Sequence, residues 1–113
     1  MIIDESQRGG IQILQPRGRI DGATSPEFQA KVLEALSQVG AGVIVDFSGV
    51  DYISSAGFRV LMTAMRQKKE GRLAVAALQP VIQEIFSIAR FQHVVPIFAS
   101  VDDAVKSWDI PAA

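Results

Sequence analysis

The chain has 113 residues, of which 49% are hydrophobic and 20% are charged, and its formal net charge is −1 at pH 7. These values are typical of one globular domain, here residues 1–113, and the nearly neutral charge argues against a nucleic-acid-binding protein, which needs a basic face. The absence of cysteine excludes disulfides and thiolate zinc sites. Because the N-terminus lacks a signal-peptide pattern and no apolar run reaches about 18 residues, we expect a cytoplasmic protein without membrane insertion.

The N-terminal segment is predicted to form a hairpin. Residues 2–5 are compatible with a short edge strand, and Gly9-Gly10 supplies a turn. In residues 11–20, isoleucines alternate with other residues up to Pro16, and the extended chain is expected to continue after a bulge. We therefore expect an antiparallel pair at the start of the sheet.

The first helix is predicted to begin within the motif Thr-Ser-Pro-Glu, after a loop. Two registers fit this motif. Thr24 at the N-cap would place Glu27 in a capping box, whereas Ser25 at the N-cap would place Pro26 at the first helical position. The glycines that follow Val39 are expected to end the helix.

Strands and helices are predicted to alternate over the rest of the chain. The remaining strands are residues 43–47, 73–78 and 94–98, and the remaining helices begin near Ser55, Pro80 and Ser100. Pro96 is expected near a sheet edge or a strand end. The helix from Ser55 should run to about Lys69 and stop at Gly71.

Each of these helices has residues at helical spacing that are expected to face the core. In the second helix these are Phe58, Leu61, Met62 and Met65. In the third they are Val81, Ile85 and Ile88, with Ile82 and Phe86 widening the face. In the last they are Val101, Ala104, Val105 and Trp108.

The predicted order is β-β-α-β-α-β-α-β-α. Strands that alternate with helices favour parallel βαβ units with right-handed crossovers. The sequence therefore predicts an α/β fold with a single mixed β-sheet, in which an antiparallel hairpin precedes the parallel units and about four helices pack on the sheet.

Two serines, Ser54 and Ser55, lie at the predicted start of the second helix. A serine at such a position ordinarily caps the helix. A phosphate there would also be favoured, because the first turn presents unpaired backbone N–H groups and a partial positive charge. Phosphorylation would add about −1.5 to −2 charges and would turn one hydroxyl into a binary switch.

The sequence offers little support for catalysis. The pattern Gly-x-Ser-x-Gly is absent around Ser55, and the single histidine, His93, is far from the serines in sequence. No phosphate-binding loop that ends in Lys-Ser or Lys-Thr occurs. Asp46 is isolated, and Asp102-Asp103 is explained by a helix first turn, so no metal site and no cofactor are expected.

Asp21 and a basic group at the end of the second helix can each be explained without a role in the site. Asp21 is expected in a turn, yet the loops of a parallel sheet would bring it to the same end as Ser55. There its carboxylate could pair with an arginine of a partner or add to the negative potential around a phosphate. The basic group Arg66, Lys68 and Lys69 is most simply a solvated helix end, suited to the helix dipole.

Two motifs resemble a known family. They are Gly-Arg-Ile-Asp-Gly at residues 18–22 and Asp-Phe-Ser-Gly-Val-Asp-Tyr-Ile-Ser-Ser-Ala-Gly at residues 46–57. Both are similar to the STAS domain of bacterial anti-sigma-factor antagonists. The resemblance implies a STAS-like fold and a regulator without catalytic activity. The resemblance further implies that such a regulator binds an anti-sigma factor with serine-kinase activity while unphosphorylated, is released on phosphorylation and is reset by a phosphatase.

The resemblance also suggests site residues. It places the phosphoacceptor at Ser55, with Ser54 as the alternative. The partner-binding residues it implies are Asp21, Gly22, Ser54, Ser55, Gly57, Phe58 and Arg59. The chain departs from the family pattern at Ser54, where many members have aspartate, at Ala56, where they have serine or threonine, and at Phe58-Arg59, where a Leu-Gly pair is common.

Two other functions remain open at this point. One is a STAS scaffold or transport accessory subunit that binds its partner constitutively, in which Ser55 serves only as an N-cap. The other is a small hydrolase that uses Ser55 and His93. The sequence does not indicate the sigma factor, the oligomeric state or a bound nucleotide.

Overall fold

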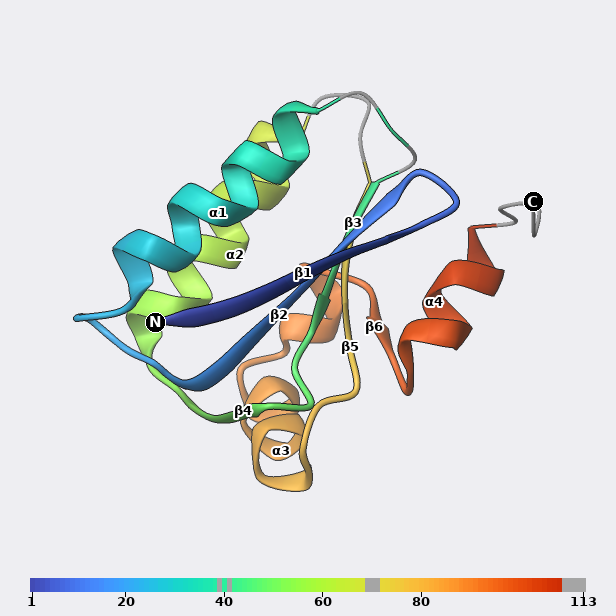
Figure 1. Ribbon diagram of the computed structural model, residues 1–113. Helices are drawn as coiled ribbons and strands as arrows, with labels where there is room; N and C mark the ends of the chain where they lie inside the picture. The colour runs from blue at the N-terminus through green and yellow to red at the C-terminus, as the bar shows by residue number, and fades with distance from the viewer. Residues whose placement is uncertain (39, 41, 69–71, 109–113) are drawn as a thin grey trace.

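The computed structural model describes residues 1–38, 40, 42–68 and 72–108 of the chain (Figure 1). The strands are β1 (Ile2–Arg8), β2 (Ile11–Ile20), β3 (Gly42–Asp46), β4 (Val50–Ile53), β5 (Leu73–Ala76) and β6 (Ile97–Phe98). The helices are α1 (Ser25–Ser37), α2 (Ser55–Gln67), α3 (Pro80–Ile88) and α4 (Val101–Ser107), with a short 3-10 turn at Phe91–His93.

The strands form one mixed sheet in the order β1-β2-β3-β5-β6, and β4 pairs separately with β2. β1 and β2 are antiparallel, with Arg8 opposite Ile11 next to the glycine turn. All the other pairs are parallel. The predicted α/β fold, with an initial hairpin followed by parallel strands, is confirmed.

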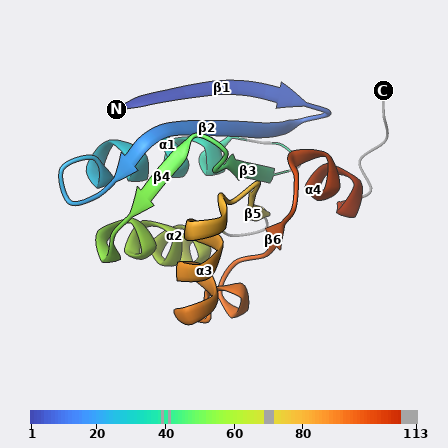
Figure 2. The ribbon, with the colours of Figure 1, turned by 90° about the horizontal axis from the view of Figure 1, so that it is seen from below.

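Helices cover both faces of the sheet (Figure 2). α1 and α2 lie side by side on one face, and their core includes Phe28 and Leu61. α4 covers the other face, where Ala104 packs in one cluster with Ile11 and Ile44. Two-sided cover explains the apolar run of β3, which is buried from Val43 to Val45. The predicted apolar stripe of α4 is confirmed.

The sheet contains a strand that the sequence analysis did not predict. β4 follows β3 after a turn of a few residues, and only its first and last residues are buried. The predicted final strand, residues 94–98, is reduced to Ile97–Phe98, because the chain before it forms the 3-10 turn. Pro96 directly precedes this edge strand, as expected. The strand predicted at 73–78 ends at Ala76.

The apolar faces of two helices were predicted only in part. In α3 the fully buried residues are Ile82 and Phe86, whereas Val81 and Ile88 are 53% and 76% exposed. In α2 Leu61 is buried, but Met62 is 41% exposed. Both helices carry apolar residues on more than one side. Those that do not face the core, such as Met62 and Ile88, point outwards.

Of the two registers considered for the start of α1, the structure has the one with Thr24 at the N-cap, but the capping box does not form. Thr24 is the N-cap residue but makes no side-chain cap hydrogen bond to the helix. Its Oγ1 accepts a hydrogen bond from the backbone N–H of Asp21 at 2.9 Å and donates to the carbonyl of Arg19 at 2.8 Å. Glu27 instead pairs with the amino group of Met1 at 3.1 Å. The threonine hydroxyl therefore fastens the preceding loop rather than the helix.

α1 ends at Ser37 and the described part of α2 at Gln67, with Lys68 as its C-cap. Val39 and the expected end of α2 at residues 69–71, Lys69 and Gly71 among them, lie outside the described residues.

Candidate functional site

The site is built where β2 and β4 end together. Their last residues, Ile20 and Ile53, are paired in register. The backbone N–H of Ser54 donates to the carbonyl oxygen of Ile20 at 2.9 Å. The loop that begins at Asp21 therefore lies next to the start of α2, so the expectation that these two loops share one end of the sheet is confirmed.

Gly57 allows α2 to pack directly on these strand ends. A Cβ atom at this position would lie 2.6 Å from Cγ1 of Ile53 and 2.8 Å from Cγ2 of Ile20. Real Cβ atoms essentially never lie this close to other atoms, so any larger residue would force either α2 or the two isoleucine side chains to move. Gly57 is buried, and its contribution to the site is to fix the position of the first turn.

The two serines differ in their surroundings. Ser54 is the N-cap residue, with extended backbone, and Ser55 is the first residue of the helix. The expectation that Ser55 is itself the cap is therefore wrong. The Oγ atom of Ser54 is buried and has no hydrogen-bond partner within the described residues. Ser55, in contrast, is exposed.

The carboxylate of Asp21 is used within its own loop. Its Oδ1 accepts hydrogen bonds from the backbone N–H groups of Ala23 at 3.0 Å and Thr24 at 3.2 Å. The pKa of Asp21 lies below its ordinary value of 3.8, chiefly because of the hydrogen bond from the Thr24 N–H. Burial of the carboxylate opposes this shift in part. The turn interpretation of Asp21 thus describes its main contacts, and Gly22 lies exposed in the same loop.

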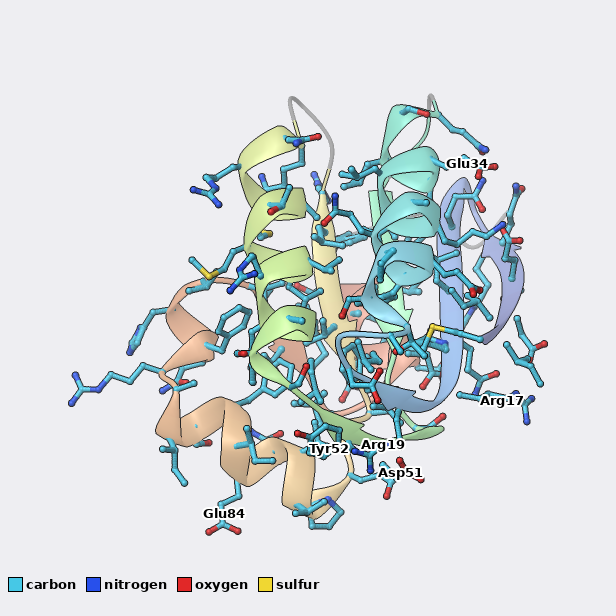
Figure 3. All side chains as sticks on the ribbon, turned by 90° about the vertical axis from the view of Figure 1, so that its left-hand side faces the viewer. Arg17, Arg19, Glu34, Asp51, Tyr52 and Glu84 are labelled. Carbon is cyan, nitrogen blue, oxygen red and sulfur yellow. The ribbon has the colours of Figure 1, made fainter. Side chains whose placement is uncertain are left out.

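Arg19 and Tyr52 form a feature beside the site that the sequence analysis missed. The two residues are opposite one another on β2 and β4. The guanidinium carbon of Arg19 lies 4.1 Å from the centre of the Tyr52 ring, and its Nε is 3.5 Å from Oδ2 of Asp21. Figure 3 shows both side chains at the lower edge of the sheet, close to Asp51. Only the pairing of β4 with β2 would have revealed this contact.

Phe58 and Arg59, adjacent in sequence, point in different directions. Phe58 is partly buried, and its ring lies 4.6 Å from that of Phe91 and 5.0 Å from that of Phe86, centre to centre. Arg59 is exposed. The outer surface of α2 therefore presents Ser55 and Arg59 in its first turns, followed by Met62 and Arg66.

The other candidate residues of the sequence analysis lie away from this site. His93 lies exposed in the 3-10 turn, and Asp102 in α4 forms an ion pair with Arg8. Among the described residues, no group of three or more His, Cys, Asp or Glu side chains could hold a metal ion. Over the same part of the chain, no helix is long and apolar enough to cross a bilayer.

Comparison with known proteins identifies the family. The STAS domain profile matches residues 3–104, and the chain belongs to this family. It is 28% identical over 101 residues to BtrV of Bordetella bronchiseptica, whose name assigns it as an anti-sigma factor antagonist; the match covers 88% of this chain and 87% of BtrV. The name of BtrV describes a regulator rather than an enzyme, in agreement with the expectation that the chain is not an enzyme.

Solved structures share the same fold. An anti-sigma factor antagonist from Mycobacterium paratuberculosis superposes with a TM-score of 0.87 at 18% identity, covering 96% of this chain and 93% of that protein. The unphosphorylated anti-sigma factor antagonist SpoIIAA superposes with a TM-score of 0.76 at 16% identity, covering 94% and 95% of the two chains. At these identities the likeness shows the fold alone.

Proposed function

We propose that this chain is an anti-sigma-factor antagonist that acts by partner switching, with Ser55 as the phosphorylated residue. In the unphosphorylated state it binds an anti-sigma factor that is also a serine kinase. Phosphorylation of Ser55 releases it, and a phosphatase resets it. Because the kinase draws on ATP, the exchange takes place in the cytoplasm.

The observation that carries the proposal is the contrast between the two serines. Ser55 is exposed at the first position of α2, whereas the Oγ atom of Ser54 is buried at the N-cap. A kinase needs access to the hydroxyl that it modifies, so the accessible Ser55 favours this site over Ser54. In the transfer, the Ser55 oxygen bonds to the γ-phosphorus of ATP, the bond to ADP breaks, and a base of the kinase takes the hydroxyl proton.

The surroundings of Ser55 suit a switch. A phosphate at the first residue of α2 lies beside unpaired backbone N–H groups and the positive end of the helix dipole, so the modified helix is stable. The charge change of about −1.5 to −2 would strongly alter the affinity of a partner for this surface. The outer surface of α2 also offers Met62, which is 41% exposed, as an apolar contact for a partner.

The test uses the wild-type chain and the variants Ser54→Ala and Ser55→Ala with the cognate anti-sigma kinase and ATP. Mass spectrometry should find one phosphate on Ser55 in the wild type and in Ser54→Ala, and none in Ser55→Ala. A phosphate that persists in Ser55→Ala, or that maps to Ser54, would overturn the site. Partner binding that survives complete phosphorylation of Ser55 would instead favour the constitutive scaffold.

A further inference from the structure

Arg59 lies on the same face of α2 as Ser55. The two residues are four apart on the helix, and both are exposed. Residues at this spacing lie on one face, with Cβ atoms roughly 5–6 Å apart. Because each Cα–Cβ bond of a helix is tilted towards the N-terminus, the Arg59 side chain starts out in the direction of Ser55.

Arg59 has no charged counterpart among the residues that the structure describes. None of the ion pairs within the described residues includes it, and the first turn of α2 contains no acidic residue. The unmodified helix therefore has an uncompensated positive charge one turn from the serine, and an anion in its first turn would relieve it.

We propose that Arg59 is the built-in counter-ion of the switch: it contacts an acidic group of the partner while Ser55 is unmodified, and it turns to the phosphate once Ser55 is phosphorylated. This inference rests on the proposed function. An anion that precedes an arginine by four residues has the favourable order for a helical ion pair. The guanidinium can also form two parallel hydrogen bonds with phosphate oxygens. Phosphorylation thus takes two contacts away from the partner: the neutral hydroxyl of Ser55 and the cation of Arg59.

Charge supports an acidic partner surface. Arg66 lies seven residues beyond Arg59 and is exposed on the same side of α2, with Met62 between them. A partner that covers this stripe therefore meets two guanidinium groups around one apolar side chain. Carboxylates flanking an apolar site complement such a surface.

The decisive experiment installs phosphoserine at position 55 during synthesis, so that no kinase is needed. The pKa of the phosphate is then measured by phosphorus NMR in the otherwise wild-type chain, in Arg59→Gln and in Arg66→Gln. A nearby cation favours the dianion and lowers the phosphate pKa. We expect that pKa to rise by at least ~0.3 in Arg59→Gln and to stay unchanged in Arg66→Gln. Arg59→Lys should give an intermediate value.

Equal phosphate pKa values in the wild type and Arg59→Gln would overturn the pairing, and so would an equal rise in the Arg66→Gln control. For the unmodified chain, Arg59→Gln should weaken partner binding by ~1.5- to 5-fold, as for a lost exposed ion pair, and should flatten the dependence of binding on salt. Unchanged affinity would overturn the role towards the partner. A kinase that does not modify Ser55 would refute the proposed function but leave the NMR result intact.

Discussion

The backbone N–H of Ser54 donates a hydrogen bond to the carbonyl oxygen of Ile20 at 2.9 Å, and this contact joins two segments more than thirty residues apart. It exists because β4 runs parallel to the end of β2. The start of α2 is thereby held at the rim of the sheet, where Ser55 is open to solvent. The position of Ser55 is thus determined by backbone pairing, so substitutions of the serine side chains should leave the fold intact.

Replacing Gly57 by alanine should destabilise the protein. The added Cβ would lie 2.6 Å from Ile53 and 2.8 Å from Ile20, so α2 must move or the two isoleucines must change rotamer. Overpacking of this kind costs about 1–3 kcal/mol in the free energy of unfolding, measurable by urea denaturation. Gly22→Ala is the matched control, because its Cβ would meet nothing within 4 Å. Equal stability of Gly57→Ala and wild type would show that the helix is not seated as described.

The two N-cap serines should respond differently to alanine. Ser100 accepts a hydrogen bond from the backbone N–H of Asp103 at 3.0 Å, whereas Ser54 makes no side-chain cap bond and its Oγ is buried without a partner among the described residues. Ser100→Ala should therefore cost about 0.5–2 kcal/mol of unfolding free energy. Ser54→Ala should change it by less than ~0.5 kcal/mol, because no cap bond is lost. A larger loss at Ser54 would mean that its hydroxyl does cap α2.

The Arg19–Tyr52 pair should be energetically coupled. The guanidinium lies 4.1 Å from the ring centre, a geometry that contributes about 0.5–1 kcal/mol at an exposed site. A double-mutant cycle with Arg19→Gln and Tyr52→Leu, followed by thermal or urea unfolding, measures this coupling directly. Strictly additive effects of the two substitutions would rule out the interaction in solution.

The stability of the loop at Asp21 should depend on pH in the acid range. Hydrogen bonds, above all from the Thr24 N–H, hold the pKa of Asp21 below 3.8, so folding favours the charged form. The corresponding stabilisation is complete above that pH and is lost as the pH falls through the folded-state pKa. Asp21→Asn keeps an oxygen acceptor but removes the charge. Its unfolding free energy should lie below that of the wild type at pH 7, and the difference should shrink towards pH 3. A difference that does not depend on pH would contradict this explanation.

The order of the main elements and the location of the candidate site could be predicted from the sequence, because each depends on local signals. Apolar runs mark the buried strands, and the glycine and serines before Phe58 mark a helix start. β4 could not be predicted in this way. Its central residues, Asp51 and Tyr52, are both exposed, so it lacks the alternation of a half-buried strand. Its pairing with β2 also shifts register between Gly18 and Arg19.

Side-chain use depends on contacts distant in sequence, and several details escaped prediction for that reason. The sequence around Thr24 fits a capping box. In the structure, however, the Thr24 hydroxyl forms hydrogen bonds with the backbone of Arg19 and Asp21 in the preceding segment. The orientation of α3 is decided by Phe86, which packs against Phe47 at 5.7 Å between ring centres and so turns Ile88 outwards. Neither contact is visible in a single segment of sequence.

The central claim is that phosphorylation of Ser55 ends partner binding. The most direct measurement is the affinity of the anti-sigma kinase for the unmodified chain and for the chain with phosphoserine at position 55, by titration calorimetry at fixed ionic strength. We predict that phosphoserine weakens binding by ~100-fold or more, since the partner surface would have to bury a phosphate and would lose its contact with Arg59. Equal affinities for the two forms would contradict it.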